Sequence, residues 1–475
     1  MRKIQTGIRL ILLAGLGSSL FAAPVSLNEA QNVAINWMST HTGRHFDVKK
    51  KSLAVKAVEG NQATHPYRLI ELEPKGWVIV SSDDTVRPVL GYGESPMNLS
   101  SLPPALKSWM EMMDRGISQN TQVRANKKLG VPKLSKYLAQ WHRLKQNPSE
   151  NTHDESMKSL AAYMQVKPLL WMGYDREEDG IIWGQGETSK YPYNIKCPTD
   201  DDGQNGHALT GCVATAIGQV LLYYGKPTHG TGSHTYLVSK SSGFQHNYGY
   251  QSANFSATTY NWNIMPFNLT NASSDDEIDA VATLLYQIGV SVEMDYGNGF
   301  NDKGSFAAYH DAKNTGADAA LKQYFGFSNV KYYERDDYTD DTWDKMLHNS
   351  LDNGNPILYG GIGTGGHAFV LDGYGTENYY HVNWGFDMVG NGWYTLDKMK
   401  PEGTNYDFSN HQQALLIDSE VNWDNYKNHV SNVDQSGIGG GCTYNPQNKG
   451  FDLMLILMLL MAGAYPLTRK YLRQV

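Results

Sequence analysis

The order of helix-like and strand-like patterns between residues 166 and 418 places the strongest constraint on the fold of this 475-residue chain. The first half of this region predicts helices around Cys212 and over 275–289. The second half predicts short strands separated by glycine-rich turns. These strands lie at 356–359, 368–372, 379–384, 393–396 and 414–418. Helices that precede a run of antiparallel strands are typical of an α+β domain, and we expect a cleft where the two halves meet.

The region ahead of this domain, 24–160, predicts a small α+β module followed by a connector. A helical pattern at 27–40 precedes strand-like runs at 67–72 and 77–81. From residue 101 the composition turns rich in Lys and Gln with little apolar material, which indicates an exposed connector open to proteolysis. The chain then divides into segments 1–23, 24–160, 161–420, 421–440 and 441–475.

The first segment, 1–23, predicts export. It begins with two basic residues, continues with an apolar run at 8–16 that one Arg interrupts, and ends in small residues. This order is typical of a secretory signal peptide, here cleaved near Ala22 or Ala23, and an uncleaved anchor is the alternative.

The last segment, 441–475, follows a polar linker at 421–440 and contains Cys442, an apolar run at 453–467 and a basic end. The apolar run is shorter than the ~20 residues of a typical transmembrane helix. A signature cysteine, a hydrophobic helix and a basic cluster resemble the C-terminal sorting tails of bacterial exported proteins, which an intramembrane protease removes. We therefore expect partners in the export and sorting machinery and a location at the cell surface or outside the cell. A permanent single-pass anchor is the alternative.

The bulk composition excludes two broad classes of protein. Charged residues make up 19% of the chain and hydrophobic residues 40%, which suits a folded chain and not a disordered one. The net charge of −8 offers no basic surface for phosphate groups, so nucleic acid is excluded as a partner. The odd set of three cysteines, Cys197, Cys212 and Cys442, argues against a disulfide framework. We expect no cofactor.

Cys212 stands at the start of a predicted helix that ends at Gly225. The positive end of a helix dipole favours a thiolate and lowers the pKa of a thiol, as a nucleophilic cysteine requires. The small residues Gly211, Ala214 and Ala216 leave room for a substrate backbone. A buried structural cysteine is the alternative reading of this segment alone.

His367 lies between a glycine turn and a predicted strand, and it follows Cys212 by 155 residues. This separation is near the ~130 to 150 residues expected between the cysteine and histidine of papain-like peptidases, so His367 is the candidate general base. Asn383 follows His367 by 16 residues, and its amide would fix the imidazole tautomer. Trp384 would shield that bond from water, although core packing is also compatible with it.

An oxyanion formed during catalysis also needs hydrogen-bond donors. The backbone N–H of Cys212 is one candidate. The side chain of Gln185, within Trp183-Gly184-Gln185-Gly186, is the other, although a glutamine in a glycine-rich surface loop is common.

Taken together, these segments resemble the streptopain family of papain-like cysteine peptidases. The matching segments are Gly184-Gln185-Gly186, Pro192-Tyr193-Asn194, Thr210-Gly211-Cys212-Val213-Ala214-Thr215-Ala216, Tyr260-Asn261-Trp262, Asp295-Tyr296-Gly297, Gly365-Gly366-His367-Ala368-Phe369-Val370 and His381-Val382-Asn383-Trp384-Gly385. The runs at 76–84 and 87–92 look like the inhibitory propeptide of that family. The resemblance implies a papain-like fold, protein or peptide substrates, the chain's own propeptide as inhibitor, and self-cleavage between about 146 and 165.

Two departures from the family pattern flank the expected substrate cleft. Phe386 stands where the family has a second tryptophan, and the loop 401–413 is shorter than the family's glycine-rich loop. Substrate specificity therefore does not carry over from the resemblance.

Four other readings compete with the peptidase. A Cys-His amidase or transglutaminase would share the thioester step, and a surface binding protein could keep a silent site. A metal site of Cys197, His207 and Cys212 fits no standard zinc spacing. A disulfide between Cys197 and Cys212 would block the nucleophile.

Overall fold

A computed structural model describes most of the chain. It covers 25–48, 66–97 except residue 85, single positions between 102 and 117, 137–146, and 164–422 with gaps at 175, 189, 300, 301, 303, 363–365 and 397–410. The predicted signal peptide and C-terminal tail lie outside the described residues. Within the described ranges, no helix has the length and apolar character needed to cross a membrane.

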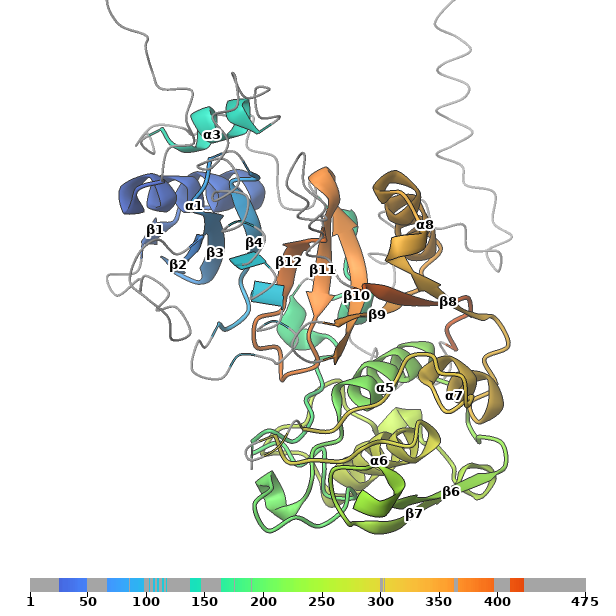
Figure 1. Cartoon of the computed structure of the whole chain (residues 1–475). Helices are drawn as coiled ribbons and strands as arrows, with labels where there is room; N and C mark the ends of the chain where they lie inside the picture. Colours follow the sequence, from blue (N-terminus) through green and yellow to red (C-terminus); the bar gives the residue numbers. More distant parts are fainter. Residues whose placement is uncertain are drawn as a thin grey trace, which may run out of the picture. The chain divides into compact units, whose positions relative to one another are not determined.

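A large antiparallel sheet organises the described chain (Figure 1). Its eleven strands follow the order β1-β2-β3-β4-β12-β11-β10-β9-β13-β8, and β5 joins by pairing with β10. The strands β6 and β7 form a separate hairpin. The strands span Asp47–Val48 (β1), Tyr67–Glu73 (β2), Gly76–Ser81 (β3), Val89–Gly93 (β4), Met164–Val166 (β5), Ser233–Val238 (β6), Gly249–Asn254 (β7), Val330–Glu334 (β8), Ile357–Ile362 (β9), Gly366–Gly375 (β10), Tyr379–Asn383 (β11), Gly392–Thr395 (β12) and Gln413–Ile417 (β13).

The sheet runs without interruption from the N-terminal module into the main domain. Strand β4 pairs with β12, with Gly91 opposite Tyr394 and Tyr92 opposite Trp393. Glycine is needed at 91 because a Cβ atom there would lie 2.7 Å from a ring carbon of Tyr394. The sequence predicts two separate α+β parts and does not reveal that they share one sheet.

Six helices pack on this sheet or on one another within the described residues. They span Leu27–Thr42 (α1), Leu138–Leu144 (α3), Cys212–Tyr224 (α5), Asp275–Ser291 (α6), Ala317–Gln323 (α7) and Asp340–Asp352 (α8). Helices α1 and α6 each begin with a capping box, formed by Ser26 with Glu29 and by Ser274 with Glu277, which satisfies backbone N–H groups at the helix start. The expected α+β architecture is confirmed.

Helix α5 lies between the sheet and α6 (Figure 1), and residues 213–224 are all buried. Two glycines define its ends. Gly211 adopts a φ of 89° just before the helix, and Gly225 ends it with a φ of 61°. A side chain at 211 would also meet Met294, whose sulfur lies 2.8 Å from the Cβ position. The helix is therefore fixed in place by the surrounding core.

The expectation of an exposed connector after residue 101 is wrong where the structure describes this region. The apolar side chains there are buried and join the core on one face of the sheet, and the Trp109 indole donates to the Thr395 carbonyl at 3.3 Å. These side chains are Leu106, Trp109, Met110, Met113 and Ile117. Further on, Trp141 of α3 is 1% exposed and packs in the core beneath α1.

A buried histidine ties the sheet to the loop before α5. His381 of β11 places Nδ1 2.7 Å from Asp372 Oδ1 and Nε2 3.7 Å from Glu177 Oε1. Ser95 of the N-terminal module donates to the other oxygen of Glu177. Burial alone would lower the pKa of His381, but the charges of Asp372 and Glu177 raise it to about 10. His381 is therefore an imidazolium between two carboxylates.

We predict that His381→Ala lowers the free energy of unfolding by about 3–5 kcal/mol, because it leaves buried carboxylates without their cation. The folded-state pKa of about 10 lies above the ordinary 6.5, so this stabilisation is complete below pH 6.5 and is lost as the pH rises through 10. Urea unfolding at pH 6 and pH 9.5 measures the difference. His229→Ala, at an exposed position, is the control, and an equal loss in both variants would contradict the assignment.

Candidate active site

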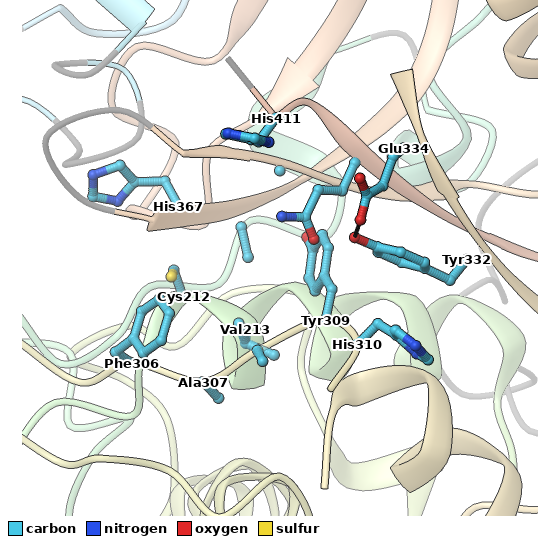
Figure 2. Close-up of a pocket in the computed structure, with 15 residues that line it drawn as sticks. Cys212, Val213, Phe306, Ala307, Tyr309, His310, Tyr332, Glu334, His367 and His411 are labelled. Atoms are coloured by element: carbon cyan, nitrogen blue, oxygen red, sulfur yellow. Dashed lines mark hydrogen bonds between the residues drawn. The ribbon is translucent and has the colours of Figure 1, made fainter. Parts of the chain in front are cut away.

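Cys212 is the first residue of α5, and its side chain is partly exposed. Its sulfur faces the start of β10, where the backbone N–H of Ala368 points at it. Figure 2 shows Cys212 at one end of a cavity, with Phe306 beside it. The candidate nucleophile is thus presented by a buried helix to a hollow on the surface.

The expected lowering of the Cys212 pKa is wrong for this structure. Burial raises the pKa of the thiol, and the N–H groups of Ala368, Val213 and Cys212 itself oppose this shift without reversing it. The N-terminal position of the cysteine on α5 is as predicted, but desolvation of the thiolate outweighs the favourable helix end.

His367 lies near the start of β10, opposite Gly361 of β9. It lines the same cavity as Cys212, and Figure 2 shows the two side chains at the same end of that cavity. The two residues that the sequence pairs as nucleophile and base are therefore brought together by α5 and β10.

The cavity has a volume of about 280 Å³. Near Cys212 its wall is apolar, with Val213, Ala307 and the half-exposed ring of Phe306. The opposite end carries polar side chains, where the Tyr332 hydroxyl donates to Glu334 at 2.7 Å. Local sequence patterns do not reveal these walls, because the residues that form them come from separate segments that share no pattern.

His310 and His411 also line the cavity. The His310 ring stacks on Tyr332 with centroids 4.8 Å apart, and its Nδ1 lies 2.9 Å from Asp318 Oδ2. His310 is therefore held against the wall by a carboxylate, at the end of the cavity away from Cys212 (Figure 2).

Asn383 and Trp384 are both 2% exposed, and Asn383 of β11 lies opposite Val370 of β10. The Asn383 amide donates to the Ile181 carbonyl at 2.9 Å and accepts from Gly385 N–H at 2.9 Å. The Trp384 indole donates to the Gly390 carbonyl, and its ring lies 4.7 Å from that of Phe369 in β10. Neither side chain is among the residues that line the described cavity, so their roles toward His367 stay predictions.

Gln185 is buried in the segment that precedes α5, and its carbonyl accepts the Thr210 N–H at 3.1 Å. Its own N–H donates to Glu187 Oε2 at 2.8 Å. Gln185 is not among the cavity-lining residues either. Its role as an oxyanion donor stays a prediction. The hydrogen bond from Thr210 links the backbone of Gln185 to the turn before Cys212.

Cys197 does not share a site with Cys212. Both are free thiols, and Cys197 is 3% exposed in the core, where burial raises the pKa of its thiol. His207 contacts the Cys197 carbonyl and not its sulfur, with Nδ1 2.7 Å from the oxygen. The described residues contain no cluster of three or more potential metal ligands.

Two family models match this chain. Residues 183–394 match the Peptidase C10 family, and residues 22–117 match the Spi protease inhibitor. The first match contains Cys212, His367, Asn383, Trp384 and Gln185. The second contains strands β1–β4 and helix α1.

Known proteins resemble the chain over most of its length. Streptopain of Streptococcus pyogenes is 29% identical over 446 residues, covering 88% of this chain and 99% of streptopain. The thiol protease/hemagglutinin PrtT of Porphyromonas gingivalis is 26% identical over 407 residues, covering 84% of this chain and 42% of PrtT. A solved fragment of Prevotella intermedia prointerpain A is 31% identical with a TM-score of 0.55, covering 75% of this chain and 96% of the fragment.

We predict that iodoacetamide modifies Cys212 in the native chain at least about tenfold faster than Cys197, because Cys212 reaches the cavity and Cys197 is enclosed. Peptide mapping after timed alkylation measures both rates. In denaturant the two rates should converge, which is the control. Native label that accumulates solely on Cys197 would overturn the assignment of the nucleophile.

Proposed function

This chain belongs to the peptidase C10 family and is a cysteine peptidase, and on that premise we propose that Cys212 is its nucleophile and His367 its general base. The observation that carries the proposal is that these two side chains, far apart in sequence, line one end of a single surface cavity (Figure 2). Nucleophilic catalysis by a thiol requires a base near the sulfur. The shared cavity end supports His367 in this role, although 155 residues separate it from Cys212 in sequence.

In the proposed reaction the Cys212 thiol passes its proton to His367 and the sulfur attacks the carbonyl carbon of a peptide bond. The resulting oxyanion is stabilised by the Cys212 N–H and by Gln185. His367 then gives the proton to the leaving amine, which leaves a thioester on Cys212. Water, activated by His367, hydrolyses the thioester and releases the acid. Asn383 fixes the imidazole orientation and Trp384 screens that contact from water.

The N-terminal module, whose sequence matches the Spi protease inhibitor, supports the proposal that the chain is made as a zymogen and inhibits itself. This module is held on the peptidase domain by the β4–β12 pairing, by the Ser95–Glu177 hydrogen bond and by a Lys75–Glu178 ion pair of 3.4 Å. Activation would need a cut in 146–165, most of which lies outside the described residues, followed by separation of β4 from β12.

We further propose that the chain is exported through the signal peptide 1–23 and acts on proteins or peptides at the cell surface or outside the cell. The C-terminal tail 441–475 would engage sorting machinery and be removed. The sequence patterns of these two segments support this part of the proposal. An amidase or transglutaminase on the same Cys-His framework is the second candidate, but an inhibitor domain favours a peptidase.

We predict that the purified chain converts on standing to a form shortened at its N-terminus, and that Cys212→Ser stays full length because it lacks the thiolate. Activity on an unfolded protein should fall by at least about 10³-fold in the variant. Electrophoresis and N-terminal sequencing follow the conversion.

Cys197→Ser is the matched control, because it removes the other described free thiol and should convert normally. Conversion of isolated Cys212→Ser at the wild-type rate would exclude self-cleavage.

We predict that Gly91→Ala accelerates conversion about fivefold or more. Its Cβ would lie 2.7 Å from Tyr394, and such overpacking costs about 1–3 kcal/mol at the β4–β12 junction. The fraction of chains in which the N-terminal module is separated from β12 would rise by the corresponding factor. The rate of appearance of mature enzyme at low concentration measures the effect.

Gly43→Ala is the matched control. This glycine lies in the same N-terminal module, where its φ of 68° makes a substitution strained, but it has no neighbour within 4 Å of the added Cβ. It weakens the same module away from β12. Equal acceleration by both variants would mean that loss of module stability, and not the junction, controls latency.

A further inference from the structure

Two carboxyl groups from distant segments meet at Gly184, next to Gln185. A Cβ atom built on Gly184 would lie 2.5 Å from Asp387 Oδ1 and 2.8 Å from Glu187 Oε2. Glu187 belongs to the segment that carries Gln185. Asp387 belongs to the tight turn that follows Trp384, where its φ is 48°. The two carboxyl groups therefore lie against the same backbone position, Gly184.

The contacts of these acids leave one oxygen of each unsatisfied. Glu187 Oε2 accepts the Gln185 N–H at 2.8 Å. The buried Oε1 of Glu187 and the buried Oδ1 of Asp387 have no hydrogen-bond partner among the described residues. Two ionised carboxylates in this position would repel each other, whereas one shared proton would supply the missing hydrogen bond.

We propose that Glu187 and Asp387 share one proton and act as positioning residues, fastening the Gln185 segment to the turn after Trp384 beside the start of α5. This inference rests on the proposed function, because its value to catalysis lies in holding the oxyanion donor Gln185 still. Neither carboxyl group is among the residues that line the cavity, so neither is assigned a step in bond cleavage.

The first turn of α5 lies between the two segments that the pair joins. Thr215 Oγ1 donates to the Gly184 carbonyl at 3.5 Å, and a Cβ atom built on Gly385 would lie 3.0 Å from Thr215 Cγ2. Both segments therefore rest on the turn that begins with Cys212. If the link between Glu187 and Asp387 were lost, the segment that carries Gln185 could move relative to the sulfur of Cys212.

The burial of Glu187 and Asp387 and the charges around them agree with a shared proton. Burial raises the pKa of Glu187 to about 7, against the opposing effect of backbone N–H groups at Gln185 and Gly186. Burial and the charge of Glu187 raise the pKa of Asp387 to about 9, against the opposing effect of Lys190. Tyr193 also faces the pair, and its hydroxyl donates to Asn268 at 3.2 Å.

The Glu187–Asp387 pair makes the stability of the folded protein depend on pH. Both folded-state pKa values lie above the ordinary values of 4.5 and 3.8, so the protonated forms are favoured in the folded protein. The stabilisation is complete below pH 3.8 and is lost as the pH rises through 7 and then 9. The pair loses its protons one after the other as the pH rises, and the loss of the second proton leaves two adjacent carboxylates.

The test compares Asp387→Asn with Asp387→Ala. The asparagine keeps a donor for Glu187 and cannot ionise, so we expect wild-type kcat/KM at pH 7 and an alkaline limb shifted up by at least about one pH unit. The alanine removes the donor, and we expect kcat to fall about 10- to 100-fold with KM little changed. Asp201→Asn, an exposed acid, is the control and should leave the pH profile unchanged.

A second measurement separates this inference from the proposed function. In Cys212→Ala chains, which cannot cleave, we expect the melting temperature to drop between pH 7 and pH 9.5. Asp387→Asn or Glu187→Gln should make this drop smaller, while the part that comes from deprotonation of His381 remains. Absence of peptidase activity in the wild type would defeat the proposed function alone, because this comparison needs no catalysis. Superimposable melting curves, or failure of both neutral variants to fold, would overturn the shared proton.

Discussion

The burial of α5 between the sheet and α6 fixes the position of Cys212, the proposed nucleophile. Every residue from 213 to 224 is buried, so the helix cannot slide without opening voids in a close-packed core. Gly211 provides the positive φ of 89° with which the chain enters this helix, at a point where Met294 leaves no space for a side chain. The position of the Cys212 sulfur is therefore a property of the core and not of a surface loop.

The same burial opposes ionisation of the thiol. Desolvation raises the pKa of Cys212 more than the N–H groups of Ala368 and Val213 lower it. A mostly neutral thiol is a weak nucleophile until a base removes its proton. In this form of the chain, with the N-terminal module in place, the sulfur is thus well positioned and chemically quiet. Under the proposed mechanism, the reactivity of Cys212 depends on the imidazole of His367, which lines the same end of the cavity.

Local patterns were enough to predict helices α1, α5 and α6 and the strands β2, β3 and β9–β13, but not β6, β7, β8, α7 and α8. The same patterns selected Cys212 and His367, which line one cavity. Glycine turns bracket both α5 and the strands that carry His367 and Asn383, so these segments are visible in sequence. The β4–β12 pairing is not visible, because it joins residues about 300 positions apart without a local signal. The buried face near Trp109 was missed because Lys- and Gln-rich neighbours mask a few spaced apolar residues. The Cys212 pKa was misjudged because sequence reports the helix start but not the desolvation.

The shared sheet makes latency a property of the whole fold. A cut in the segment between the two parts breaks one covalent bond but leaves β4 hydrogen-bonded to β12, with Ser95 on Glu177 and the Trp109 indole on Thr395. Departure of the module would turn β12 into an edge strand and expose Trp393, which is 4% exposed while the module is bound. Cleavage and release are therefore distinct steps, and the second is opposed by apolar burial and backbone pairing that the first does not touch. A module held in this way can inhibit after the chain is cut, until it unfolds or is digested.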